Sequence, residues 1–174
     1  MIIFIDETGF SFQIGTGTTW APKGRTPELR RVSKQRQVST AIGLTTSGGI
    51  YKNHFDHAIH GEDTVVHLEH LCRQIHGPKI IIGDRLQAHR SRVVKAFLGD
   101  HPEIDLEWLP SYAPELNPEE GCHGNVKDRM KGATPRTEAE IREQADRGFA
   151  RLRRRPDLLL AFFHHAGLSI KRLT

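Results

Sequence analysis

The sequence predicts an α/β domain in which helices cover both faces of a mixed sheet. Two apolar runs of β-favouring residues, 2–6 and 79–84, each end in an aspartate and show no helical period. Two further strand-like segments between them are joined by a tight turn, and segments with helical periodicity separate the later strands. Strands separated by helices usually pair in parallel and are buried on both faces, so both aspartate-ending strands should be central.

The first third of the chain predicts an antiparallel meander. Apolar and polar residues alternate along 37–46, and the Ser-Gly-Gly that follows is typical of a hairpin turn. We expect a strand at 2–6 that Gly9 ends, a short strand at 10–14, a loop at 15–27, and paired strands at 37–46 and 50–55.

The rest of the chain predicts helices that alternate with strands and then continue alone. Asn117 followed by Pro118 indicates an N-cap and first helical position, Thr137 to Glu140 matches a capping box, and Pro156 ends that helix, so that Asp157 can cap the next. We expect helices at 61–75, 90–98, 118–130, 138–155 and 157–163, and strands at 79–84 and 104–109. The expected inward-facing residues include Val93, Val94, Phe97, Ile141, Ala145, Phe149 and Leu152.

The composition indicates a globular chain with a basic surface. It has 174 residues, a formal net charge of +4 and a sequence pI near 9.3. Basic residues concentrate at 23–36 and 151–155, and such blocks either contact phosphate backbones or form solvated charged faces. Two cysteines are too few for a disulfide framework, and no apolar run reaches the ~20 residues that cross a bilayer. We therefore expect a cytoplasmic protein without membrane contact.

Three carboxylates are positioned to meet at one edge of the sheet. If the strands that end in Asp6 and Asp84 are adjacent and parallel, both aspartates emerge at the carboxyl edge, where open α/β sheets place their sites. Glu120 lies in the first turn of a helix that follows the loop 110–118. Divalent ions can serve both ends of an in-line phosphodiester displacement, and Mg²⁺ prefers carboxylate oxygens. Clustered carboxylates repel one another unless cations bind them, so the pattern predicts a divalent-metal site.

Each candidate also has a purely structural interpretation. An aspartate at a strand end is often a turn former or helix cap. Glu120, three residues after Asn117, fits the reciprocal glutamate of a capping box. His89 either orients a phosphate or carboxylate, or is a surface hydrogen-bonding residue. Trp20 either stacks on a base, or packs in the core or anchors its loop. The histidine-rich tract 54–60 sits where a strand ends, so no regular face gathers its side chains around a metal.

Four motifs are distinctive: Asp6-Glu7-Thr8-Gly9-Phe10; Thr19-Trp20-Ala21-Pro22-Lys23-Gly24; Asp84 with His89-Arg90-Ser91; and residues 109–120, Leu-Pro-Ser-Tyr-Ala-Pro-Glu-Leu-Asn-Pro-Glu-Glu. Together they resemble the catalytic domain of DDE transposases, in particular the bacterial insertion-sequence proteins of the mariner-related superfamily. The resemblance spans residues 2–131, and the Tyr-Ala-Pro-Glu-Leu-Asn-Pro-x-Glu run is its most specific part.

The resemblance implies a ribonuclease-H-like fold, a mixed five-stranded sheet flanked by helices on both faces, plus C-terminal helices. It implies that Asp6, Asp84 and Glu120, rather than Glu119, are catalytic and bind two Mg²⁺ or Mn²⁺ ions. The implied activity is cleavage of DNA at transposon ends and strand transfer into a target. The residues that we expect to support the site or bind DNA are His89, Arg90, Trp20, Lys23, Arg25, Asn117, Lys127, Arg153 and Arg154.

The chain departs from the family pattern at three places. Arg85 stands where Asn usually follows the second aspartate, and Gly121-Cys122-His123 replaces a bulky Gln-x-Trp. The N-terminal helix-turn-helix region that binds terminal repeats is expected to be absent, because the chain begins at the first catalytic strand. The alternative function is a truncated, catalytically inactive remnant that at most binds DNA non-specifically.

The expected organisation is a single catalytic domain over residues 1–174, with a core at about 1–133 and a helical C-terminal part at about 134–174. The resemblance implies DNA as a partner, both transposon ends and target. It also implies a separate N-terminal transposase fragment, a homodimer in the active state, and a bacterial, nucleoid-associated location.

Overall fold

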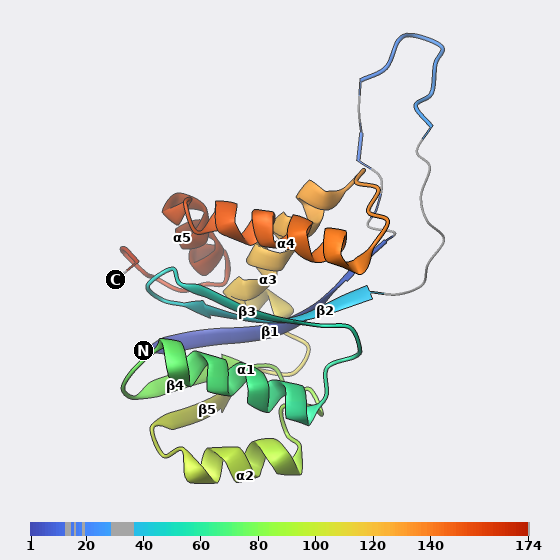
Figure 1. Ribbon diagram of the computed structural model, residues 1–174. Coiled ribbons are helices and arrows are strands. Elements are labelled where there is room, and N and C mark those ends of the chain that lie inside the picture. The colour runs from blue at the N-terminus through green and yellow to red at the C-terminus, as the bar shows by residue number, and fades with distance from the viewer. Residues whose placement is uncertain (13–14, 16, 19, 29–36, 174) are drawn as a thin grey trace.

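The computed structural model describes residues 1–12, 15, 17–18, 20–28 and 37–173. This part of the chain forms a mixed sheet with the strand order β3-β2-β1-β4-β5, flanked by helices (Figure 1). The strands are β1 Ile2–Ser11, β2 Gln37–Thr45, β3 Ile50–Phe55, β4 Lys79–Gly83 and β5 Ile104–Trp108. The helices are α1 Gly61–Gln74, α2 Arg92–Asp100, α3 Pro118–Met130, α4 Glu138–Leu152 and α5 Pro156–His165, with a 3-10 turn η1 at Pro114–Leu116.

β1 is the central strand and joins the antiparallel and parallel halves of the sheet. It pairs antiparallel with β2 and parallel with β4, and β4 pairs parallel with β5. The predicted adjacent, parallel placement of the two aspartate-ending strands is therefore confirmed. The predicted hairpin is confirmed as well, since β2 and β3 pair antiparallel. Gly48 in its turn has a φ of 84°, a conformation that glycine adopts without steric cost.

β1 is longer than the sequence predicts. Gly9 does not end it, because residues 3–11 all pair with β2, so the ladder continues through the glycine. The strand expected at 10–14 is the end of β1 as far as Ser11, and residues 13–14 lie outside the described residues.

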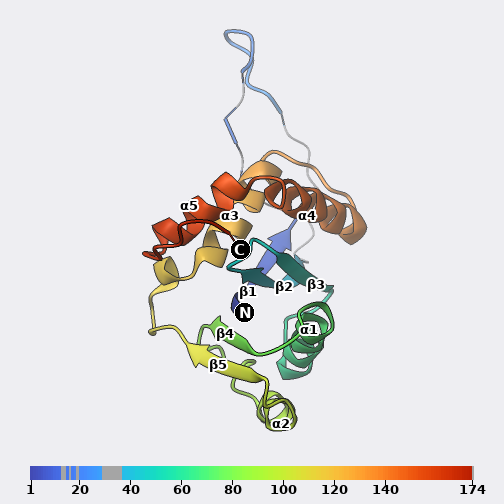
Figure 2. The same ribbon diagram turned by 90° about the vertical axis from the view of Figure 1, so that its left-hand side faces the viewer.

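Two helical layers cover the two faces of the sheet, as predicted (Figures 1 and 2). α1 and α2 share one core cluster with Ile3 and Ile5, whereas α3, α4 and α5 share the other with Phe4 and Phe10. Successive side chains of a strand point to opposite faces, so β1 contributes to both clusters. Asp6 lies two residues after Phe4, so its side chain points to the same face of the sheet. This is the face that α3 covers.

The later helices pack closely on that face. The predicted inward stripe of α4 is confirmed, since Ile141, Ala145, Phe149 and Leu152 are all fully buried. On α3, a Cβ added at Gly121 would lie 2.6 Å from two ring atoms of Phe162 on α5. The glycine that departs from the family pattern thus permits the close approach of α5.

Two other local predictions are wrong. Val93 is exposed rather than inward, because the short helix α2 begins at Arg92 and buries only a narrow stripe that includes Val94. Asp157 does not cap α5, since the N-cap position is Arg155, whose guanidinium pairs with the Asp157 carboxylate. None of the helices in the described ranges is long and apolar enough to cross a membrane.

Candidate active site

The register of the parallel strands brings two of the predicted site residues together. β1 pairs with β4 at a constant offset, Ile2 with Ile80 and Phe4 with Ile82, and continuing that offset places Asp6 level with Asp84. Asp84 directly follows the last residue of β4. Both aspartates consequently lie at the carboxyl edge of the parallel pair, where an open α/β sheet leaves room for a ligand.

An open cavity of about 590 Å³ lies at this edge. Asp6, Asp84 and Glu120, the three predicted metal ligands, all line it. The loop from Leu109 to Pro114 forms another part of the wall. Residues that are distant in sequence thus converge on one cavity, with one carboxylate each from β1, the end of β4 and α3.

Asn117 fixes the start of α3 beside β1. Its side-chain oxygen accepts a hydrogen bond from the backbone N–H of Glu119 at 3.2 Å, which confirms the predicted N-cap. Its amide nitrogen donates to the carbonyl of Ile5 at 3.2 Å. Because Ile5 precedes Asp6, this buried residue sets the position of the first turn of α3 relative to the aspartate.

Glu120 does not act as the reciprocal residue of a capping box. The backbone N–H of Asn117 donates to the carbonyl of Pro114 at 2.9 Å, so it does not need the glutamate. The Glu120 carboxylate instead lies 3.0 Å from His123 Nε2 and lines the cavity. The structural interpretation of Glu120 as a cap is therefore set aside by this geometry.

His123 joins the carboxylates, although in the sequence it stands out only as a departure from the family pattern. Its Nε2 lies 3.4 Å from Asp6 Oδ2 and 3.0 Å from Glu120 Oε2. The ligand atoms of Asp6, Glu120 and His123 lie within 4.8 Å of one another. The sequence signal was the Glu-x-x-His spacing, which places both side chains on one face of a helix.

Glu119 has the opposite environment to its neighbour Glu120. It is fully buried, and neither carboxyl oxygen has a hydrogen-bond partner among the described residues. Burial, reinforced by the negative charges of Asp6 and Glu120, raises the pKa of Glu119 well above its ordinary value. Burial therefore disfavours the ionised form of this carboxyl.

His89 holds Asp84 in place. Its Nδ1 lies 3.0 Å from Asp84 Oδ1, and its Nε2 lies 3.2 Å from Glu7 Oε1. Burial alone would lower the pKa of His89, but its contacts with Asp84 and Glu7 outweigh burial and raise the pKa to about 10. His89 is thus a buried imidazolium between two carboxylates. Glu7 was not predicted as a site residue, because only the folded chain brings it to His89.

The rim of the cavity is basic and aromatic. Arg85 and Arg90 both line it, with exposed side chains. Tyr112, also in the wall, is fully exposed and has a φ of 60°. A non-glycine residue in this left-handed region is uncommon, and such conformations cluster at functional sites.

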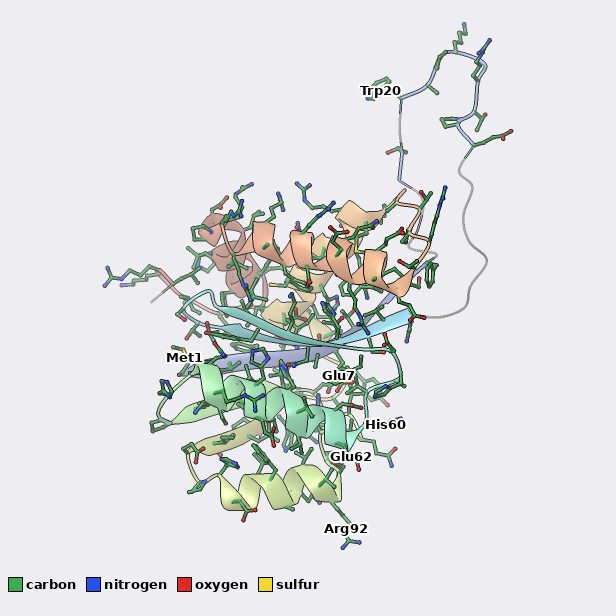
Figure 3. All side chains as sticks on the ribbon, in the orientation of Figure 1. Met1, Glu7, Trp20, His60, Glu62 and Arg92 are labelled. Atoms are coloured by element: carbon green, nitrogen blue, oxygen red, sulfur yellow. The ribbon has the colours of Figure 1, made fainter. Side chains whose placement is uncertain are left out.

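The other predicted DNA-binding residues lie elsewhere. Trp20 is fully exposed on the segment that connects β1 and β2. It lies far from the sheet, so it does not pack in the core (Figure 3). Lys23 and Arg25 are exposed on the same segment. The Lys127 ammonium lies over the Phe10 ring, 6.0 Å from its centroid.

The basic residues after α4 are also outside the cavity. Arg153 donates to the backbone carbonyl of Ile50 on the edge strand β3, and it lines a different hollow with Tyr51 and Lys52. Arg154 is exposed. The remainder of the basic block at 23–36, from residue 29 onward, lies outside the described residues.

The histidines of the tract 54–60 have separate partners. His54 bonds to Thr40 and Asp146, and His57 lies 3.1 Å from Asp63. A different potential ligand group, Cys72, His101 and Glu103, lies around α1 and the segment before β5, away from the cavity.

The donor set at the cavity fits a divalent cation. It offers carboxylate oxygens, which Mg²⁺ and Mn²⁺ prefer, and one imidazole nitrogen. The buried oxygens of Glu119 beside it have no hydrogen-bond partner among the described residues. The arrangement can therefore hold a cation at the edge of the sheet, next to basic side chains that suit a phosphate.

A family model described as "DDE superfamily endonuclease" matches residues 1–142. No curated protein sequence matches the chain. Among solved structures, a Mos1 mariner paired-end complex with Mn matches at 16% identity with a TM-score of 0.68, covering 95% of this chain and 53% of that one. A Mos1 transposase paired-end complex with the left transposon end matches at 15% identity and a TM-score of 0.64, covering 98% and 56%.

The catalytic domain of Mos1 mariner transposase, solved alone, also matches, at 14% identity with a TM-score of 0.57. The match covers 98% of this chain and 84% of the Mos1 chain. At such identities the likeness establishes the fold, and the ribonuclease-H-like prediction is confirmed. The chain spans about half the length of the longer transposase chains that it matches.

Proposed function

Because the chain belongs to the DDE superfamily endonucleases, we propose that it is the catalytic domain of a transposase that cleaves DNA at transposon ends and transfers the cut strand into a target. The observation that carries the proposal is the convergence of Asp6, Asp84 and Glu120 on one open cavity at the carboxyl edge of β1 and β4.

Asp6, Asp84 and Glu120 would hold the divalent ions, and a pair of such ions is part of the proposal. Bound there, divalent metal would supply an activated water or hydroxyl and stabilise the leaving oxygen of an in-line displacement. Two of the similar Mos1 structures are described as complexes with Mn and with Mg. The carboxylates are pre-arranged for this role: Asn117 fixes Glu120 relative to β1, and His89 fixes Asp84.

DNA is the proposed partner. Arg85 and Arg90 at the rim are placed to contact phosphate oxygens flanking the scissile bond, where a cationic donor both orients the backbone and offsets its charge. The similar Mos1 structures include a complex with a left transposon end and a strand transfer complex. A homodimer and a separate N-terminal end-binding fragment are further parts of the proposal, which light scattering and pull-down with terminal-repeat DNA can check.

The test is a plasmid-nicking assay on the purified chain with Mg²⁺ or Mn²⁺. The wild type should nick in a metal-dependent way, and Asp84→Asn should fall to the level of the chelator-treated control. Thermal melting should show that the variant is folded, and His76→Gln, at an exposed position after α1, should nick like the wild type.

Equal nicking by wild type and Asp84→Asn, together with no calorimetric binding of either metal, would contradict the proposal. The chain would then be an inactive relative that binds DNA through its basic surface. Arg85 is the observation that favours this second function, because a fixed cation beside the aspartate opposes metal binding.

A further inference from the structure

We propose that His123 is a metal ligand, and that with Asp6 and Glu120 it forms a mixed nitrogen–oxygen site that selects a transition-metal ion such as Mn²⁺ over Mg²⁺. The inference rests on the proposed function, because it concerns the same cavity. It adds a ligand that the three carboxylates do not supply, and it names the class of cation that this chain prefers.

The distances around His123 match those between ligands of a single ion. Metal–ligand bonds of about 2.0–2.2 Å place neighbouring ligand atoms roughly 3 Å apart. The His123 Nε2 lies 3.0 Å from Glu120 Oε2 and 3.4 Å from Asp6 Oδ2. One ion can therefore contact all three atoms with only small side-chain movements.

The positions of α3 and β1 bring these ligands close together before any ion binds. Glu120 and His123 are three residues apart on α3 and so share one helical face, the Glu-x-x-His arrangement that recurs in carboxylate-bridged metal sites of helical bundles. Asp6 comes from the central strand, and Asn117 ties the start of α3 to that strand through the Ile5 carbonyl. The site thus joins two rigid elements.

A second, independent observation points to a cation at this place. The Glu119 side chain is fully buried, both of its oxygens lack hydrogen-bond partners among the described residues, and Oε2 lies 3.7 Å from His123 Nε2. A buried polar group without a partner costs about 1–3 kcal/mol. A cation held by the neighbouring side chains would offset that cost.

The imidazole determines the preference among cations. Mg²⁺ takes oxygen ligands almost exclusively and keeps several waters, whereas imidazole suits first-row transition metals. A nitrogen ligand should therefore strengthen the binding of Mn²⁺ much more than that of Mg²⁺. In the family pattern described above a tryptophan stands at this position, and an indole cannot ligate a metal in this way.

The competing arrangement is a positively charged His123 that neutralises the carboxylates in place of a metal. The two arrangements predict opposite effects of removing the imidazole. If His123 is a ligand, His123→Gln weakens Mn²⁺ binding. If it is a resident counter-ion, His123→Gln frees the carboxylates, and both Mn²⁺ and Mg²⁺ bind more tightly.

The experiment is calorimetric titration of Mn²⁺ and Mg²⁺ into the wild type, His123→Gln, Asp6→Asn and the surface control His76→Gln. Loss of groups that merely support a ligand costs 10–100-fold in metal affinity, so loss of His123 should weaken Mn²⁺ binding by at least about tenfold and Mg²⁺ binding less. Asp6→Asn should weaken both metals, and His76→Gln should match the wild type.

Pulsed electron paramagnetic resonance of the wild type with bound Mn²⁺ and ¹⁵N-labelled histidine makes the test independent of whether His123→Gln folds. A directly bound histidine nitrogen is the expected result. Absence of that coupling, or unchanged or tighter Mn²⁺ binding by a folded His123→Gln protein, overturns the inference while leaving the carboxylate site intact. Failure of the wild type to bind either metal instead overturns the proposed function as well.

Discussion

Glu119 and Glu120 are adjacent, chemically identical residues in opposite environments. Glu120 lines the cavity with a side chain that is 43% exposed, whereas Glu119 has no exposed surface and an elevated pKa. Helix geometry causes the difference, since consecutive residues point about 100° apart around the axis. One carboxyl is accessible to a ligand in the cavity, and the other is a buried group with a raised pKa.

Glu120→Gln should abolish metal-dependent nicking, because an amide replaces an ionised ligand. Glu119→Gln should retain most of the activity, because Glu119 is buried outside the cavity lining and the amide has nearly the same shape as the carboxyl. Nicking rates of the two variants, normalised to folded protein, compare them directly. Loss of activity in Glu119→Gln with retention in Glu120→Gln would show that the ligand is the other glutamate.

For individual residues, the sequence was informative where a local motif identifies the residue. Asn117 as a cap, and Asp6 and Asp84 at the edge of the sheet, follow from turn signals and strand ends. Glu7 did not stand out, because its partner His89 is distant in the chain. For His123 the only signal was its spacing from Glu120, since its other partner, Asp6, is on a different element. Only the tertiary structure shows that His89 joins Glu7 to Asp84.

At the scale of elements, α3 carries two glycines in contrasting places. A Cβ at Gly121 would meet the Phe162 ring at 2.6 Å, whereas a Cβ at Gly124 would meet no atom within 4 Å. The same substitution should therefore have opposite effects at two positions on one helix.

Gly121→Ala should destabilise the protein by about 1–2 kcal/mol, because overpacking costs about 1–3 kcal/mol and the gain in helix propensity recovers up to ~1 kcal/mol. Gly124→Ala should stabilise it by up to ~1 kcal/mol. Denaturant unfolding of both variants measures the difference. Equal stabilisation by both would mean that α5 does not pack against Gly121.

α1 buries a histidine against the sheet. His67 bonds to Asn53 at 2.7 Å, and burial, with the nearby charges of His70 and His89, lowers the pKa of His67 to about 3. An unfolded histidine titrates near 6.5. Between these values the unfolded chain binds a proton that the folded protein excludes, so this residue removes stability as the pH falls from about 6.5 towards 3.

His67→Gln should reduce the loss of unfolding free energy as the pH falls through this range. At about 1.4 kcal/mol per pKa unit, the wild type should lose roughly 4 kcal/mol more than the variant across that range. Denaturant unfolding at a series of pH values, with His76→Gln as the exposed control, gives the two curves. Parallel curves for wild type and His67→Gln would contradict the burial argument.

The elements themselves were largely predictable. Apolar runs, helical periodicity and a glycine-rich turn gave all five strands and five helices, because each signal is local. The errors fell where contacts with neighbouring elements determine the local structure. β1 continues through Gly9 because β2 pairs with it. Val93 faces solvent because α2 packs through a narrow stripe.

At the scale of the whole molecule, the basic residues fall into separate groups. Arg85 and Arg90 line the cavity, whereas Arg153 is engaged with the edge strand and Arg154 lies beside it. The sequence could identify the basic blocks but not which of them share a surface with the carboxylates.

Arg85→Gln combined with Arg90→Gln should weaken DNA binding and reduce the slope of log K against log salt by about 1–2, since each phosphate contact contributes about 0.9. Arg73→Gln, on the exposed face of α1, is the matched control and should leave the slope unchanged. Arg153→Ala with Arg154→Ala should also flatten the slope if the end of α4 contacts DNA. A smaller salt slope only in the variant with Arg153→Ala and Arg154→Ala would indicate that DNA binds away from the cavity.

The resemblance in the four sequence motifs is confirmed at the level of the family, and the strand order and helical layers are those the fold requires. Long-range pairing between β1 and β4 was predictable because both strands are continuous apolar runs, which only a central position buries. The cavity itself was not, since its lining depends on how α3 and the loop before it pack against β1.

We propose that Asp6, Asp84 and Glu120 form one divalent-cation site. An anomalous-scattering map from a crystal of the wild-type protein soaked in Mn²⁺ tests this site directly. We expect a strong peak in the cavity within bonding distance of these carboxylates, and its loss in Asp84→Asn. An empty cavity, or a peak only at Cys72, His101 and Glu103, would contradict it.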